Sequence, residues 1–120
     1  MYQYKATVVR VVDGDTVYLD IDLGFRIRMT IDVRLYGLDA PELRGPSRAA
    51  GLKAKAYVEN ALPVGAMVIV KTYKAEKYGS YLAEVWYLPG ATEREQIIAQ
   101  GRHLNQELLD AGFAVPYLVK

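Results

Sequence analysis

The sequence contains no cysteine and only one histidine, His103. The lack of cysteine excludes disulfide bonds and thiolate metal sites, and a single histidine excludes a site made of several imidazoles. A metal ion bound to this chain would therefore have to be a hard cation held by oxygen atoms. The carboxylates are the first side chains to consider as ligands.

A large excess of charge and a long apolar run are also missing. The net charge is +1, so the basic footprint of many nucleic-acid-binding domains is absent and phosphate binding would depend on locally placed charge. No apolar run approaches the about 20 residues that span a bilayer, and Met1–Lys5 does not resemble a signal peptide. We therefore expect no membrane partner, and a chain that is either intracellular or a trimmed, mature form.

What is present is the composition of an ordinary globular domain. Of the 120 residues, 52% are hydrophobic and 24% are charged, without repeats or low-complexity stretches. This length and composition predict a single compact domain with one core, covering residues 1–120.

The first half of the sequence shows the alternation that is typical of β-strands. Three strands are predicted at residues 4–12, 16–22 and 26–36, joined by short turns that contain glycine. The second strand is expected to present one apolar face, made of Val17, Leu19 and Ile21. The third is expected to present a longer apolar face, made of Ile27, Met29, Ile31, Val33 and Leu35.

The second half mixes helices and strands. A helix is predicted at residues 47–62, capped by Ser47 and buried through Leu52, Ala56 and Val58. Strands are predicted at residues 66–73 and 81–88. Residues 92–96 are predicted to be a solvent-exposed insertion, and a short helix is expected at residues 105–111, closed by Gly112.

This order of elements is that of an OB-fold. It predicts an α+β protein that is mainly β: a five-stranded OB-fold barrel with one helix between strands three and four and a short C-terminal helix. Small SH3-like barrels and other α+β folds are compatible with the same order.

Acidic residues stand at the ends of the predicted strands. Asp13 and Asp15 flank a glycine at the first turn, and Asp39 and Glu42 follow the third strand. Each segment alone is compatible with an ordinary turn or loop. In a curled barrel, however, the start of strand two and the end of strand three lie at the same end, so Asp15 and Asp39 can meet. Two carboxylates that close together repel unless a cation neutralises them.

Three segments in order resemble the staphylococcal nuclease family. They are Val12–Val17, Val33–Glu42 and Glu76–Ala83, and the later run Ala99–Asn105 is also similar to the family. The resemblance covers residues 5–117, and agreement of three motifs with the predicted strands and helix is specific for the fold. It implies a Ca²⁺-dependent nuclease acting on single-stranded or flexible DNA or RNA, and we expect it to be a monomer.

The resemblance also implies roles for individual residues. Arg34 and Glu42 would be catalytic: Arg34 would bind the scissile phosphate and Glu42 would position or deprotonate the attacking water. The metal ligands would be Asp15, Asp39 and the carbonyl of Ala40. The remaining implied site residues support the metal or contact the substrate, and they are Asp13, Thr16, Lys77, Tyr78 and Tyr117.

The sequence departs from the family at Ser80, where the family has a second arginine on the phosphate. Ser80 brings no charge, and losing one preorganised donor costs on the order of 10²–10³ in rate. Four other arginines are candidates to replace it, although each is also explained as a plain surface charge: Arg44, Arg48, Arg94 and Arg102. The alternative to an active nuclease is therefore a catalytically impaired module that binds nucleic acid or protein, or a purely structural barrel.

Aromatic residues are the last feature to weigh. Most of the 10 tyrosines fall in predicted strands, where packing explains them, although some could stack nucleic-acid bases. Trp86 is expected to be a core or barrel-edge residue, and His103 a satisfied histidine near a turn.

Overall fold

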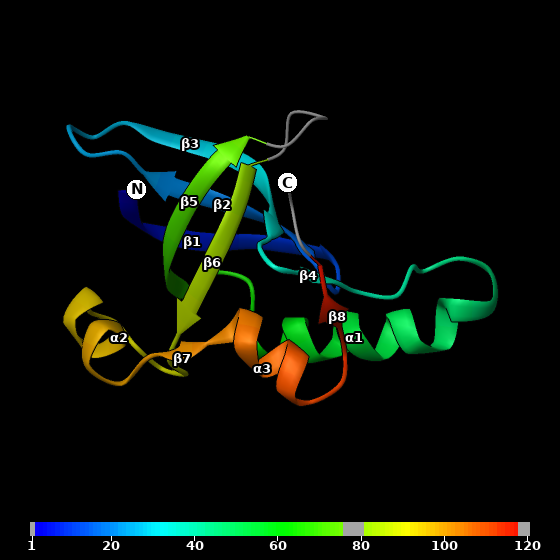
Figure 1. Ribbon diagram of the computed structural model, residues 1–120. Helices are drawn as coiled ribbons and strands as arrows, with labels where there is room; N and C mark the ends of the chain where they lie inside the picture. Colours follow the sequence, from blue (N-terminus) through cyan, green and yellow to red (C-terminus); the bar gives the residue numbers. More distant parts are fainter. Residues whose placement is uncertain (1, 76–80, 118–120) are drawn as a thin grey trace.

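The computed structural model describes residues 2–75 and 81–117 of the chain (Figure 1). The elements, in chain order, are β1 (Tyr2–Asp13), β2 (Thr16–Asp22), β3 (Arg28–Leu35), β4 (Leu38–Asp39), η1 (Gly45–Ser47), α1 (Arg48–Ala61), β5 (Met67–Ala75), β6 (Tyr81–Tyr87), α2 (Arg94–Gln100), β7 (Arg102–His103), α3 (Leu104–Asp110) and β8 (Val115–Pro116). None of the described helices has the length and apolar character of a membrane span.

The main sheet closes into a five-stranded barrel, which confirms the predicted OB-fold. The strand order is β3-β2-β1-β5-β6-β7, and β3 also pairs with β6. The closing pair is parallel and places Arg34 beside Leu82, whereas the other pairs are antiparallel. Figure 1 shows β5 and β6 crossing the β1–β2–β3 meander, with the helices gathered below the barrel.

The predicted alternation of β2 is confirmed, but that of β3 holds only at one end. Val17, Leu19 and Ile21 are all buried. Val33 and Leu35 of β3 are also buried, whereas two residues expected on the same face are not: Met29 of β3 is 48% exposed, and Ile27, just before the strand, is 56% exposed. The reason is that β3 pairs with β6 only through residues 33–35. The earlier part of β3 belongs to a hairpin with β2 that extends beyond the closed barrel.

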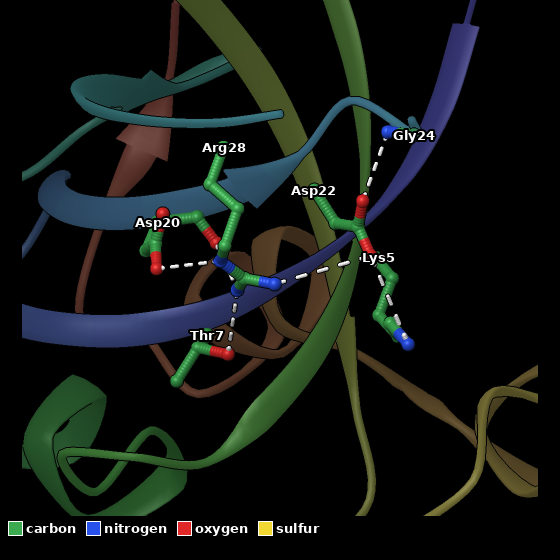
Figure 2. Close-up of polar contacts among 6 residues, drawn as sticks. All are labelled: Lys5, Thr7, Asp20, Asp22, Gly24 and Arg28. Carbon is green, nitrogen blue, oxygen red and sulfur yellow. Dashed lines mark hydrogen bonds and ion pairs between the residues drawn. The ribbon is translucent and has the colours of Figure 1, made fainter. Parts of the chain in front are cut away.

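A charged cluster connects this hairpin to β1 (Figure 2). Arg28 Nε donates to Asp20 Oδ2 at 2.8 Å, and its Nη1 lies 3.9 Å from Asp22 Oδ2. The same carboxylate of Asp22 lies 3.9 Å from Lys5 Nζ on β1. These side chains are exposed to solvent, so water and salt screen the ion pairs and each pair contributes little to stability.

Helix α1 buries its small residues rather than its large ones, contrary to the sequence prediction. Val58 is buried as expected, together with Gly51 and Ala54, but Leu52 is 45% exposed and Ala56 is also exposed. The sequence prediction chose Leu52 because it is the larger apolar residue. The helix instead packs its backbone close to the neighbouring segments, and this close packing leaves room only for glycine and alanine. Ser47 does occupy the N-cap, but its hydroxyl donates to two carbonyl oxygens instead of capping the helix.

The predicted exposure of residues 92–96 to solvent is confirmed, but a helix that the sequence analysis did not predict begins within this segment. The segment starts helix α2, whose N-cap Glu93 and residue Gln96 form a reciprocal capping box. The signal was present in the sequence as an acidic residue followed three positions later by glutamine. Ile97 is the buried residue of this helix, and it anchors α2 against the barrel. Helix α3 lies within one residue of its predicted position.

Candidate active site

Asp15 is fixed inside the turn between β1 and β2. Its residue is only 8% exposed, and Oδ2 accepts a hydrogen bond of 3.0 Å from the backbone N–H of Ala40. Oδ1 lies 3.2 Å from the hydroxyl of Thr16, which donates to it. The turn and the loop after β3 are therefore joined directly through one buried carboxylate.

Gly14 allows this close approach. A Cβ at Gly14 would lie 2.7 Å from the Cβ of Ala54 on α1 and 2.8 Å from the Cβ of Ala40. The φ angle of Gly14 is not in the left-handed region. Space, and not turn conformation, is thus the physical reason for glycine in the Asp-Gly-Asp segment.

Arg34 lies between the two carboxylates that the sequence predicted to meet. Its Nη2 donates to Asp39 Oδ1 at 3.1 Å and lies 3.9 Å from Asp15 Oδ2. Asp15 and Asp39 are thus both within 4 Å of one guanidinium nitrogen. Because β2 and β3 are antiparallel, with Thr16 opposite Arg34, the barrel gathers these side chains at one end.

The last described residues lie against this site. Strand β8 pairs with β4 and sets Asp39 opposite Val115, and the N–H of Tyr117 donates to the carbonyl of Gly37 at 3.0 Å. The guanidinium carbon of Arg34 is consequently 5.6 Å from the centre of the Tyr117 ring. Beside Asp39, the loop and the segment before β8 enclose a hollow of about 180 Å³.

Glu42 lies three residues beyond Asp39 and is exposed to solvent. Its backbone is held firmly, because its carbonyl accepts a hydrogen bond of 3.1 Å from the Ser47 hydroxyl. The same carbonyl oxygen would lie 2.4 Å from a Cβ at Gly51. Glycine at this position of α1 therefore lets the helix support the loop that carries Glu42.

Asp13 supports the turn from the other side. Its Oδ1 accepts a 3.0 Å hydrogen bond from the N–H of Asp15. Burial raises the pKa of Asp13 to about 6, and the neighbouring Asp15 carboxylate also contributes to this increase. Asp13 therefore holds its proton more tightly than an ordinary aspartate does.

The donor chemistry of Asp15 and Asp39 fits a hard divalent cation. The buried carboxylate of Asp15 and the exposed carboxylate of Asp39 both lie near the guanidinium of Arg34, which supplies the positive charge between them. Within residues 2–75 and 81–117, however, no three acidic or histidine side chains cluster closely enough to form a metal cage. A bound ion would therefore need backbone, water or substrate oxygens as further ligands.

Several predicted site residues lie elsewhere or outside the described part of the chain. Lys77, Tyr78 and Ser80 fall within residues 76–80, outside the described residues. Of the arginines considered as substitutes for the missing family arginine, Arg102 is paired with Glu107. Arg94 belongs to α2, at the end of the molecule away from β4 (Figure 1). Arg44 and Arg48 are exposed near the Glu42 loop.

Sequence reasoning missed Asn105, which fixes the end of β3 to β6. It is only 3% exposed. Its amide nitrogen donates to the carbonyls of Tyr36 and Ala83, both at 3.0 Å, and its Oδ1 accepts from the N–H of Val85 at 2.9 Å. Tyr36 lies between Arg34 and Asp39 in the chain, so Asn105 holds the segment that carries both. The available signal was an asparagine next to Leu104 and three residues before Leu108, on the apolar side of a short amphipathic helix.

Comparisons with known proteins identify a family and several relatives to which the chain is similar. The family model described as staphylococcal nuclease homologue matches residues 32–120. An uncharacterized protein of Methanocaldococcus jannaschii is 29% identical over 96% of this chain, and it is covered over 60% of its own length. The endonuclease YhcR of Bacillus subtilis is 31% identical over 98% of the chain, and the protein ParB of Escherichia coli is 29% identical over 96%.

The chain is shorter than each of these relatives. It spans 9% of the Bacillus endonuclease and 58% of the Escherichia coli protein. The similarity therefore concerns one portion of each relative.

Proposed function

The chain belongs to the staphylococcal nuclease family, and from this premise we propose that it is a Ca²⁺-dependent phosphodiesterase that cleaves single-stranded or flexible DNA or RNA. Family membership supports a nuclease-like or nucleic-acid-binding module. The observation that favours catalysis is the common contact of Arg34 with Asp15 and Asp39. Packing alone does not explain two carboxylates that repel each other, because a pair of apolar side chains would pack better at the same positions.

In this proposal Asp15, Asp39 and the carbonyl of Ala40 hold the ion, while Thr16 and Asp13 support it. Bound Ca²⁺ would supply positive charge that stabilises the phosphate oxygens during attack. Neutralisation by an ion would also free Arg34 from its contact with Asp39, leaving its planar fork available for a substrate phosphate.

The remaining roles belong to residues around this centre. Glu42, exposed at the loop, takes a proton from the attacking water as a general base. Tyr117, next to Arg34, flanks the nucleotide. Lys77 and Tyr78 contact a neighbouring phosphate or base.

Hydrolysis of denatured DNA tests the proposal. With Ca²⁺ we expect cleavage that EDTA abolishes and that the substitution Glu42→Gln lowers by about 10²–10⁴-fold, as loss of a general base does. Glu59→Gln is the matched control, because Glu59 is an exposed residue of α1 and should leave the rate unchanged. Cleavage that persists in EDTA, or in the Glu42 variant, would contradict the assigned mechanism.

A second candidate is a binding module without turnover, and Ser80 favours it. The family's second arginine is absent at this position, so one charged donor to the phosphate is missing. A silent wild type that Ser80→Arg restores to activity would establish an otherwise intact nuclease site disabled at one position. Robust wild-type cleavage would instead indicate that another group supplies the charge, and Arg44 and Arg48 would then be the arginines to substitute first.

A further inference from the structure

Two stacked ring pairs lie on the outer face of the barrel around β6. The rings of Tyr36 and Tyr73 are 4.3 Å apart at an interplanar angle of 16°. The rings of Trp86 and His103 are 4.8 Å apart at 13°. Both pairs bridge neighbouring elements: Tyr36 follows β3 and Tyr73 is on β5, while Trp86 on β6 faces His103 on β7.

Glu84 connects the two pairs into one row. It lies on β6 between them, two residues before Trp86. The hydroxyl of Tyr73 donates to Glu84 Oε2, and His103 Nε2 lies 3.1 Å from Glu84 Oε1, within ion-pair distance although the geometry makes no hydrogen bond. Ala83, Val85 and Tyr87 alternate with these positions and are buried in the core, so the row faces outward.

This aromatic row (Tyr36, Tyr73, Glu84, His103 and Trp86) begins at the candidate active site. Tyr36 is two residues beyond Arg34 and directly follows the end of β3, so the row starts next to the residue expected to bind the phosphate. Tyr36 is 37% exposed, so the ring that stacks on Tyr73 still offers surface to solvent.

The other end of the row opens into an apolar hollow. Its volume is about 280 Å³, and it lies between the barrel and α2, lined by Gln3, Ile69, Trp86, Ile97 and Ile98. Ile98 is 62% exposed although it borders the hollow. The Trp86 ring therefore stacks on His103 and also lines the apolar hollow.

We propose that the aromatic row is a track on which the bases of a single-stranded nucleic acid stack as it leaves the phosphate at Arg34. Aromatic side chains spaced along a groove bind single strands without sequence preference, because every base has a π-face. A duplex keeps its bases stacked inside and cannot use such a row. The inference rests on the proposed function for the phosphate at Arg34, and it adds a binding surface for the bases that lie beyond that phosphate.

Two cations and the Glu84 carboxylate lie along the row, so its electrostatic attraction for a nucleic acid is weak. Lys71 Nζ lies 5.9 Å from the centre of the Tyr73 ring, and Arg34 precedes Tyr36 by two residues. With these two cations on phosphates, the logarithm of the affinity should fall with the logarithm of salt concentration with a slope of about −1.4. Stacking would carry the remaining affinity.

Trp86 makes the track directly measurable, because it is the only tryptophan in the chain. The experiment titrates the protein in EDTA with oligothymidylates of two to eight nucleotides and records tryptophan fluorescence. We expect quenching that grows with length and levels off at about four nucleotides or more, as in other OB-folds. Working in EDTA separates binding from cleavage, so quenching without hydrolysis in Ca²⁺ would support the track and contradict the proposed activity.

Substitutions at Tyr36 test the stacking itself. Tyr36→Leu keeps apolar volume but removes the π-face, and we expect affinity to fall by about 5- to 150-fold, the loss of one stacked base. Tyr36→Phe should bind like wild type. Tyr18→Leu is the control, since Tyr18 is a partly buried strand tyrosine stacked with Arg10 outside the row.

A purely structural role for the rings gives different results. In that case Tyr36→Leu would lower the unfolding temperature but leave the affinity for oligothymidylate unchanged. Absence of quenching at every length in the folded wild type, or equal binding of duplex and single strand with equal quenching, would overturn the proposal.

Discussion

Asn105 shows how one buried polar side chain can hold two functional residues in place. Its amide satisfies two carbonyls and one N–H on the segments after β3 and in β6. Truncation would remove one hydrogen bond from each of these three backbone groups, although the Ala83 carbonyl would still accept from the N–H of Tyr36. Groups left without a partner are costly because they lose water without gaining a hydrogen bond.

We predict that Asn105→Ala lowers the free energy of unfolding by about 3 kcal/mol, with one to two unsatisfied groups as the main cause. Urea unfolding followed by circular dichroism measures the change. Gln106→Ala, on the exposed side of the same helix, should stay within about 0.5 kcal/mol of wild type. A similar loss in both variants would assign the effect to helix propensity instead.

Gly51 is a second residue whose role depends on distance. An alanine in a helix normally stabilises by about 0.5–1 kcal/mol relative to glycine. At Gly51 the added Cβ would lie 2.4 Å from the carbonyl oxygen of Glu42 and 2.9 Å from that of Pro41. Both atoms are backbone, so neither can rotate away.

Gly51→Ala is therefore expected to lower the free energy of unfolding, although helix propensity alone would raise it. It should also displace the Glu42 loop and reduce any nuclease activity. Urea unfolding of this variant beside Ala56→Gly, at an exposed position of the same helix, gives the comparison. Stabilisation by Gly51→Ala would mean that the helix and the loop separate at little cost.

At the scale of elements, Glu107 joins α3 to three neighbours. Tyr57 of α1 donates to its Oε1 at 3.1 Å, and Tyr87 of β6 donates to the same oxygen. Arg102 of β7 donates to Oε2 at 2.5 Å. Burial pushes the pKa of Glu107 up, but the hydrogen bonds from Tyr87, Arg102 and Tyr57 together push it further down, so the pKa lies below its ordinary value.

This lowered pKa gives a pH dependence with a defined sign. The ionised Glu107 contributes its stability above the unfolded pKa, which is about 4.3, and the contribution is lost as pH falls through the folded pKa. We predict that Glu107→Gln lowers the free energy of unfolding at pH 7 and makes the stability profile flatter below pH 5. Unfolding curves between pH 7 and pH 2 test this, with Glu59→Gln as the control that keeps the wild-type acid slope.

At the scale of the whole molecule, the candidate site exists only where the barrel closes. Arg34 lies opposite Thr16 on β2 and beside Leu82 on β6, and Asp15 reaches Ala40 from a turn that is 25 residues away in the chain. The unfolded chain cannot hold Asp15 and Asp39 together. Any ion that they bind must therefore stabilise the folded state.

We predict that Ca²⁺ raises the unfolding temperature, with a stabilisation of about 2.7 kcal/mol when its concentration is 100 times the dissociation constant. Asp15→Asn should abolish the shift, whereas Asp110→Asn, at an exposed position on α3, should keep it. Differential scanning calorimetry with and without Ca²⁺ measures both. An equal shift in the two variants would place the bound ion elsewhere.

Local patterns in the sequence predicted much of this molecule. The alternation of Val17, Leu19 and Ile21 identified the buried face of β2, because a strand has a period of two whatever surrounds it. Because the second and third strands were expected to be antiparallel neighbours, Asp15 was expected to lie near Asp39. The capping box of α2 is also local, and the exposure of residues 92–96 was predicted correctly, although the helix that begins there was not.

Tertiary structure decided what depends on distances between segments. The burial of β3 ends where its pairing with β6 ends, so the exposed Ile27 and Met29 follow the same alternation as the buried Val33. The need for glycine at positions 14 and 51, the anchoring by Asn105 and the aromatic row all arise where residues remote in sequence come into contact. By itself the sequence determined the strands, the barrel class and the residue types of the site, since these follow from local periodicity and side-chain chemistry. Only the closed barrel decided which side chains face each other, because that depends on register and packing across the whole chain.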